Sequence, residues 1–246
     1  MESYFLTDTG RVREHNEDNV TIIKNLNDEY LLAVADGMGG HKAGEVASSI
    51  AINHLSKSFM EMEKLGDKAS TVKWLRKEIE DINNEIFEYT STHPESKGMG
   101  STLVLAIYSK DYLLFGNIGD SSGFVIKDNG LYKITKDHTL VNLLVKNGEL
   151  TPEEAKNHPK KNILMRALGA NNPIEIDIFN VDDEIEGIVL CSDGLTSMLN
   201  NTQIERVLLQ EGPLEEKVIK LIRKANIRGG TDNISVACLF TKEAEE

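Results

Sequence analysis

Short apolar runs rich in β-branched residues recur along this chain and constrain its fold more than any other feature. Their lengths and turn-like boundaries are typical of β-strands. Several runs are apolar at consecutive positions, as in residues 101–107, so both faces of such a strand must be covered. We therefore expect stacked layers, with strands at 20–23, 30–35, 102–107, 112–118, 123–127, 174–181, 188–191 and 234–240.

Helical spacing of apolar residues marks the segments between and after these strands. It predicts long helices over 43–59 and 75–86, and a further helix opened by Pro213. Thr202 precedes Glu205 by three residues, which is a capping-box signature for one more helix start. Strands and helices come in clusters and do not alternate strictly. The pattern predicts an α+β fold in which helices lie outside two packed sheets.

The 246 residues contain no repeat and no Pro/Gly/Ser-rich linker, so we expect a single domain over 1–246. The stretch 140–165 differs from the rest because it is polar and basic, with a short helix start at Thr151. A long excursion of this kind is either a functional flap or a surface insertion that only connects, and the residues alone leave both interpretations open.

Charge and cysteine content restrict the partners and the compartment. With 27 basic and 40 acidic side chains the net charge is −13, which argues against nucleic acid and anionic membranes as partners. No run has the apolar length of a membrane span, and the N-terminus lacks the pattern of a secretory signal. Cys191 and Cys238 lie in apolar runs and are expected to be buried thiols. We expect a soluble cytoplasmic protein.

Four segments share one design, in which an apolar strand is followed by an aspartate beside glycine or another small residue. A single Asp-Gly after a strand is usually a turn. Four together can bring carboxylates to one rim of the sheets, where they would repel one another unless a cation neutralised them. The segments carry Asp36, Asp120, Asp193 and Asp232, and a fifth segment, 11–19, is rich in charged residues.

The ligand types indicate a hard divalent cation. The six histidines form no His-x-His or His-Glu-x-x-His pair and the two cysteines form no Cys-x-x-Cys, so Mg²⁺ or Mn²⁺ is favoured over zinc. Two such ions about 3.5–4 Å apart can supply a hydroxide and hold a phosphoryl group for in-line attack. Arg13 is the candidate anchor for that phosphate, and an ion pair with Glu14 or Glu17 is the alternative.

Seven motifs in order resemble the protein phosphatase 2C family of metal-dependent phosphatases, and most closely its compact bacterial members. The resemblance runs from about residue 7 to 239. The motifs are Arg13-x-x-Asn16-Glu17-Asp18, Asp36-Gly37-Met38-Gly39-Gly40, Gly100-Ser101-Thr102, Gly116-Asn117-x-Gly119-Asp120-Ser121, Asp137-His138, Ser192-Asp193-Gly194 and Gly230-Thr231-Asp232-Asn233.

The resemblance implies a four-layer α-β-β-α sandwich of two antiparallel sheets, with a two-metal centre at one end and a flap at about 140–165. It implies that a metal-bridging hydroxide hydrolyses phosphoserine and phosphothreonine esters of proteins phosphorylated by a companion kinase, and we expect a monomer. The resemblance further implies that Asp36 bridges both metals, that the Gly37 carbonyl binds one, and that Asp193 and Asp232 bind the other. It implies that Glu17 and Asp18 hold metal-bound waters and that Arg13 binds the substrate phosphate. Asp120 with Asp193 would lie near a third, looser metal, and Asn233 would support the ligands.

The chain departs from the family pattern at two positions. Met38 stands where some members have a histidine proposed to protonate the leaving group, so the general acid is unassigned, although His41 is near in sequence. Ser122 stands where the family usually has arginine.

The sequence supports two other classes of function less well. A pseudoenzyme that only binds phosphoproteins should have lost a metal carboxylate, and it would bind Mn²⁺ at one site or none. A nucleotide-binding loop at 37–42 lacks the spacing of a phosphate loop, and its glycines follow an aspartate that phosphate would avoid; ATP binding without metal would favour it.

Overall fold

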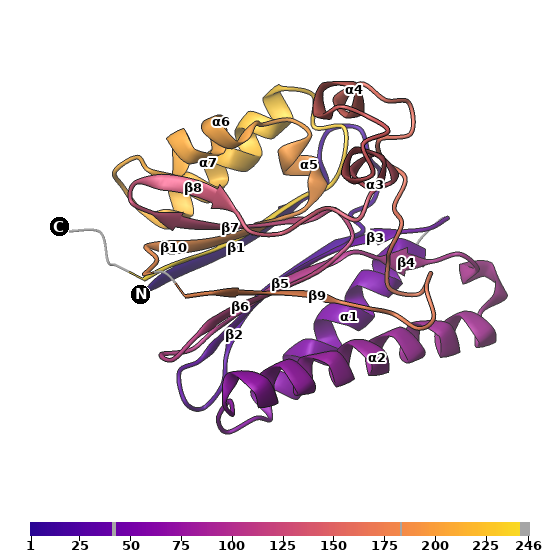
Figure 1. Cartoon of the computed structure of the whole chain (residues 1–246), viewed down its shortest axis with the longest axis horizontal. Coiled ribbons are helices and arrows are strands. Elements are labelled where there is room, and N and C mark those ends of the chain that lie inside the picture. The colour runs from indigo at the N-terminus through magenta and orange to yellow at the C-terminus, as the bar shows by residue number, and fades with distance from the viewer. Residues whose placement is uncertain (41–42, 183, 242–246) are drawn as a thin grey trace.

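Two antiparallel β-sheets lie face to face at the centre of the fold (Figure 1). The structure, a computed structural model, describes residues 1–40, 43–182 and 184–241. The first sheet has the order β1 (Glu2–Asp8), β11 (Ile234–Phe240), β10 (Gly187–Cys191), β7 (Ser122–Lys127) and β8 (Gly130–Lys133). The second has the order β2 (Asp18–Lys24), β3 (Tyr30–Met38), β5 (Leu103–Tyr108), β6 (Leu113–Ile118) and β9 (Asp177–Val181), and β4 (Gly100–Ser101) pairs with β3.

The central strands bury both faces, as their sequences predict. Along β3, Leu31 and Ala33 point to the helices outside the second sheet, whereas Leu32 and Val34 point between the sheets. Strand β10 alternates in the same way between the space under its own helices and the space between the sheets. Side chains of successive strand residues point to opposite faces, so an uninterrupted apolar strand needs a covered surface on each side.

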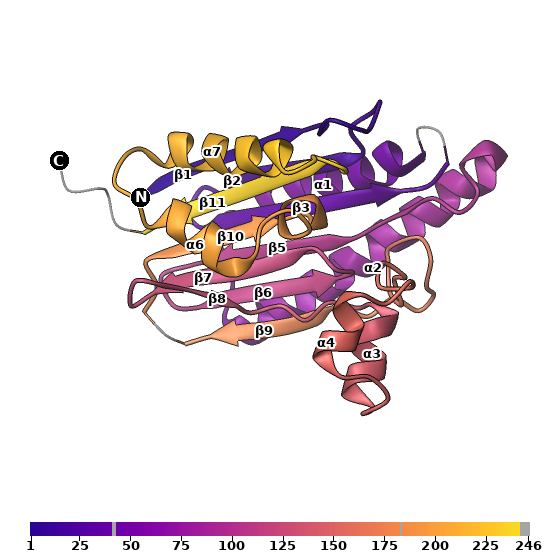
Figure 2. The same cartoon turned by 90° about the horizontal axis from the view of Figure 1, so that it is seen from above.

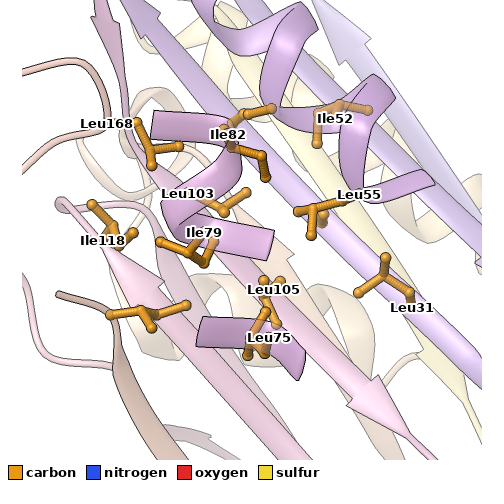
Figure 3. Close-up of a cluster of buried hydrophobic side chains, with 14 of the residues drawn as sticks. Leu31, Ile52, Leu55, Leu75, Ile79, Ile82, Leu103, Leu105, Ile118 and Leu168 are labelled. Atoms are coloured by element: carbon orange, nitrogen blue, oxygen red, sulfur yellow. The ribbon is translucent and has the colours of Figure 1, made fainter. Parts of the chain in front are cut away.

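Helices cover the outer face of each sheet and complete the four-layer sandwich (Figure 1). Helices α1 (Ala43–Met60) and α2 (Lys68–Thr92) pack on the second sheet, followed by the short η1 (Pro94–Ser96). Figure 3 shows the apolar layer that they form with it, in which Ile79 and Ile82 of α2 lie over Leu103 and Leu105 of β5. Helices α5 (Asp193–Thr196), α6 (Asn201–Leu208) and α7 (Leu214–Ile227) cover the first sheet. The predicted fold class is confirmed.

The stretch 140–165 forms a separate pair of short helices at one end of the sandwich, away from the N-terminus (Figure 2). They are α3 (Leu140–Lys146) and α4 (Pro152–Lys156), and α4 begins with a capping box between Thr151 and Glu154. An isolated bridge between Thr139 and Leu164 closes the base of this excursion.

Some local predictions were wrong. Strand β1 was missed because it is an edge strand that directs only Tyr4 and Leu6 into the apolar layer. The capping box of α6 joins Asn200 to Gln203, so the Thr202–Glu205 prediction was two residues out of frame. The expected strand at 174–181 begins only at Asp177.

The cysteines and the helices can be compared with the expectations from the sequence. The cysteines are free and buried, as predicted. Within the described ranges, no helix has the length and apolar character needed to cross a bilayer.

Candidate metal centre

Antiparallel pairing brings four acidic residues of the second sheet to one end of the sandwich. Asp18 begins β2 and lies opposite Asp36 near the end of β3. Asp120 follows the end of β6, which pairs with the start of β5 beside Thr102. The Thr102 hydroxyl accepts the backbone N–H of Asp36 at 3.1 Å and lies 2.7 Å from the Ser121 hydroxyl. Glu17 lies next to Asp18, and its carbonyl accepts the N–H of Gly37 at 3.1 Å.

The first sheet contributes two more aspartates to the same end. Asp193 follows β10 and Asp232 precedes β11, and these two strands are antiparallel neighbours. Gly194 makes this approach possible, because a Cβ at that position would lie 1.9 Å from the Asn233 carbonyl oxygen. Gly37 is similarly confined, since its Cβ would lie 2.1 Å from the Gly44 carbonyl oxygen. Both Asp-Gly pairs are therefore sites of close backbone approach.

A cavity of about 470 Å³ opens between the two sheets at this end. Most of the predicted site residues line its wall, including Arg13, Glu17, Asp36, Gly37, Asp120, Asp193, Asp232 and Asn233. Asp18 lies behind the wall and is 4% exposed. Further lining comes from the end of the 140–165 excursion and the residues after it, namely Asn162, Leu164, Met165, Arg166 and Ala167.

Burial and mutual repulsion raise the pKa values of these carboxyl groups. Burial, with the negative charges of Asp18 and Asp193, raises the pKa of Asp36 well above its ordinary value. Burial, with the negative charges of other nearby carboxylates, raises the pKa of Asp18 to about 7, that of Asp120 to about 7 and that of Asp193 to about 6. Burial also raises the pKa of Glu17. Without a cation, some of these groups hold protons near neutral pH.

One carboxylate oxygen at this site has no hydrogen-bond partner among the described residues. The Ser192 hydroxyl donates to Oδ2 of Asp18 at 2.7 Å while accepting the N–H of Ser235 at 2.9 Å. Oδ1 of the same carboxylate is buried without a hydrogen bond. An unpaired buried carboxylate oxygen is costly, so this orphan atom together with an oxygen-only donor set fits a hard divalent cation.

Arg13 reaches the cavity, but its ion pair is not the one that sequence suggested. Its Nη2 donates to Oδ2 of Asp232 at 2.8 Å, and the described ion pairs include none with Glu14 or Glu17. About half of the Arg13 side chain remains exposed. The guanidinium therefore lies beside the carboxylates with further N–H groups available to an anion.

Asn233 connects the backbone segments around the site. Its Oδ1 accepts the N–H of Glu17, and its Nδ2 donates to the carbonyls of Thr9 and His15, all at 2.9 Å. Its own N–H donates to Oδ1 of Asp232 at 2.9 Å. The Asn233 side chain thus connects backbone segments around the site, and its backbone N–H orients Asp232.

The departures from the family pattern leave no histidine in the cavity wall among the described residues. Met38 lines the cavity and its thioether has no proton to donate. His41 lies outside the described residues. Ser122 is buried, and its hydroxyl has no partner among the described residues.

A second group of possible metal ligands lies elsewhere. Only His54, Glu78 and Asp81 of the described residues bring three ligand atoms within 4.8 Å of one another. They lie on α1 and α2, and neighbouring side chains already engage them: His54 bonds Glu78 and Glu85, and Lys77 pairs with Asp81. The predicted carboxylates are more widely spread, which is compatible with two ions but not with one small ion held by all of them.

One cluster of side chains beside the cavity was not predicted from the sequence. Arg166 lines it, donates to Oδ1 of Asp177 at 2.6 Å and lies 3.3 Å from Nε2 of His138. His138 also accepts the N–H of Gly119, next to Asp120, at 3.1 Å. The Asp137-His138 motif was the only available signal, since Asp177 looks like an ordinary strand residue.

Comparisons with known proteins show which proteins this chain is similar to. The profile of the family described as Protein phosphatase 2C matches residues 9–226. The serine/threonine phosphatase stp of Listeria welshimeri is 44% identical over 96% of this chain and 94% of that protein. The solved structure of the Streptococcus agalactiae serine/threonine phosphatase has 38% identity and a TM-score of 0.92, covering 98% of this chain and 99% of that one. A solved catalytic domain of the phosphatase PstP in complex with two manganese ions has 34% identity and a TM-score of 0.81, covering 96% of each chain.

Proposed function

Because this chain belongs to the protein phosphatase 2C family of metal-dependent protein phosphatases, we propose that it hydrolyses phosphoserine and phosphothreonine esters with a hydroxide supplied by a pair of divalent cations. The observation that carries the proposal is the meeting of carboxylates from both sheets with Arg13 at a single cavity, which Arg166 also lines. A phosphomonoester dianion needs positive charge on one side and a source of nucleophile on the other, and this cavity can provide both.

The carboxylates are the proposed ligands of two Mn²⁺ or Mg²⁺ ions. Asp36 would hold both ions, the Gly37 carbonyl would bind one of them, and Asp193 with Asp232 would bind the other. When bound, such ions lower the pKa of water toward neutrality and offset charge on the phosphoryl oxygens. The relative that was solved with two manganese ions supports this number of ions.

Glu17 and Asp18 would accept hydrogen bonds from water at the ions. Asp18 suits this role because its Oδ2 is occupied by Ser192 and its Oδ1 is not. Asp120, with Asp193, is the proposed place of a third, looser ion. Asn233 supports the ligands through its bonds to Glu17 and Asp232.

Arg13 binds the substrate phosphate. Its bond to Asp232 orients the guanidinium, and the remaining N–H groups support an anion-binding role beside the carboxylates of the wall. Met38 has no proton to give to the leaving alkoxide, so it is not the general acid.

The cellular setting is part of the same proposal. We propose that the chain works in the cytoplasm as a monomeric single catalytic domain over 1–246, and that it opposes a serine/threonine kinase acting on the same phosphoproteins. The names of its relatives as serine/threonine phosphatases support the choice of substrate.

The test is hydrolysis of a phosphothreonine peptide across a metal series, with an EDTA control and with Asp36→Asn. We expect phosphate release with Mn²⁺ or Mg²⁺, none in EDTA, and none from Asp36→Asn. Calorimetry with Mn²⁺ should show two sites. Folded, metal-loaded protein that releases no phosphate from any phosphopeptide would contradict the proposal.

A further inference from the structure

A second groove of about 640 Å³ adjoins the metal centre and is not used by the chemistry described so far. It lies between the end of β8, the start of α3 and residues 165–166. Met165 and Arg166 line both this groove and the catalytic cavity, so the two are neighbours that share a wall. The remaining lining includes three lysines and Leu143 together with polar and acidic side chains.

The charges in the groove do not cancel. Its two acidic residues are engaged, because Asp137 pairs with Lys133 at 2.6 Å and Asp177 pairs with Arg166 at 2.6 Å. Lys136 and Lys146 also line the groove, are exposed, and form no ion pair with any described residue. These two lysine side chains therefore have no acidic partner among the described residues.

This positive patch contrasts with the rest of the protein. The stretch 133–166 carries seven basic and four acidic residues in a chain whose net charge is −13. Local positive potential beside a catalytic cavity steers and holds acidic partners rather than serving solubility, which the overall negative charge already provides.

The groove also exposes apolar side chains. Leu143 is 41% exposed and Met165 is 46% exposed, and both line it. Two lysines without ion pairs, beside exposed apolar side chains, can bind a polypeptide that carries acidic and apolar residues close together.

We propose that this groove binds an acidic segment of the phosphoprotein substrate that flanks the phosphorylated residue. Carboxylates of that segment pair with Lys136 and Lys146, while an apolar residue contacts Leu143 and Met165. The shared wall lets one extended chain reach from the cavity into the groove. The inference rests on the proposed function, since it names the substrates that the same site prefers.

The kinetic test uses two phosphothreonine peptides with one core, flanked on both sides either by glutamate or by glutamine. Wild-type protein should show a kcat/KM about tenfold higher for the acidic peptide, mainly through KM, because two exposed ion pairs contribute on that scale. The preference should shrink as salt rises. In the double variant Lys136→Gln/Lys146→Gln, kcat/KM for the acidic peptide should fall to that of the neutral one.

The matched control is Lys160→Gln/Lys161→Gln, which removes the same charge from the same excursion at residues that do not line the groove. This control should keep the wild-type preference. Loss of the preference in the control, its survival in the groove variant, or equal turnover of both peptides by wild type would overturn the proposal.

A binding measurement separates this proposal from the proposed function. Fluorescence anisotropy with the unphosphorylated glutamate peptide should show weaker binding to the groove variant than to wild type and to the control. If wild type binds this peptide through the groove but hydrolyses neither phosphopeptide, the proposed function fails and the groove stands. If it hydrolyses both equally and binds the acidic peptide no better than the neutral one, the groove proposal fails alone.

Discussion

Replacing Asp120 with asparagine should stabilise the metal-free protein at alkaline pH. Burial, with the charges of Asp193 and Asp137, raises the pKa of Asp120 from 3.8 to about 7. One pKa unit corresponds to about 1.4 kcal/mol, so ionising Asp120 in the folded state costs at most about 4 kcal/mol. Its partial exposure allows solvent screening, so we expect a gain of about 2–4 kcal/mol for Asp120→Asn at pH 8.

The sign follows from proton linkage. The folded pKa of Asp120 is raised above its unfolded value, so the folded state binds more protons between about pH 4 and 7. Wild-type stability therefore falls as pH rises through that window. Asparagine does not titrate, so the advantage of the variant should be full above pH 7, smaller at pH 5 and absent below pH 4.

The assay is urea or thermal unfolding in EDTA at several pH values, with exposed Asp111→Asn as the control for loss of one surface charge. The expected gain at pH 8 is roughly 4–16 °C in Tm. With saturating Mn²⁺ the gain should shrink or reverse, because a cation then offsets the wild-type charge. A gain that is the same at pH 5 and pH 8, or a variant less stable than wild type in EDTA, would refute this account of the carboxylate cluster.

Other consequences can be checked with the same protein. Asp36→Asn should reduce turnover to the EDTA background with an intact fold, measured by phosphate release and circular dichroism; wild-type turnover would exclude Asp36 as a ligand. Arg13→Ala should lower kcat/KM for a phosphopeptide about ten- to a hundredfold, since a hydrogen bond to a charged group contributes ~1.5–3 kcal/mol; unchanged kinetics would remove Arg13 from the phosphate site. Ser192→Ala should weaken Mn²⁺ binding in calorimetry, because Asp18 loses its orienting 2.7 Å bond, and an unchanged Kd would show that the bond is dispensable. Mn²⁺ should raise Tm more at pH 8 than at pH 6, since protons on Asp18 and Asp193 compete with the metal at the lower pH; the opposite trend would contradict the raised pKa values.

The layers of the fold could be predicted because they follow from local patterns. Apolar residues at consecutive positions of β3 and β5 required cover on both faces, and the periodic apolar residues of α2 supplied it on one side. Edge strand β1 escaped because half of its residues face solvent. The capping box of α6 was predicted wrongly because Asn-x-x-Gln and Thr-x-x-Glu start two residues apart in the sequence. Only the backbone path decides which of them begins the helix.

Some features of the candidate site could likewise be predicted from the sequence and others could not. Aspartates beside small residues at strand ends could be found from sequence, since antiparallel strands bring the end of one to the start of the next. The sequence could not predict which oxygen of Asp18 lacks a hydrogen bond or which carboxylate pairs with Arg13. It also could not predict that His138 and Arg166 both contact Asp177.

The sequence by itself determined the residue types, their order along the strands and the need for covered sheets, because burial and strand period act between near neighbours. Tertiary structure alone decided the contacts between segments such as 18 and 192 or 13 and 232. Those pairs depend on how two sheets stack and on which backbone atoms approach at their common end, and that geometry is set by the packing of all the layers together.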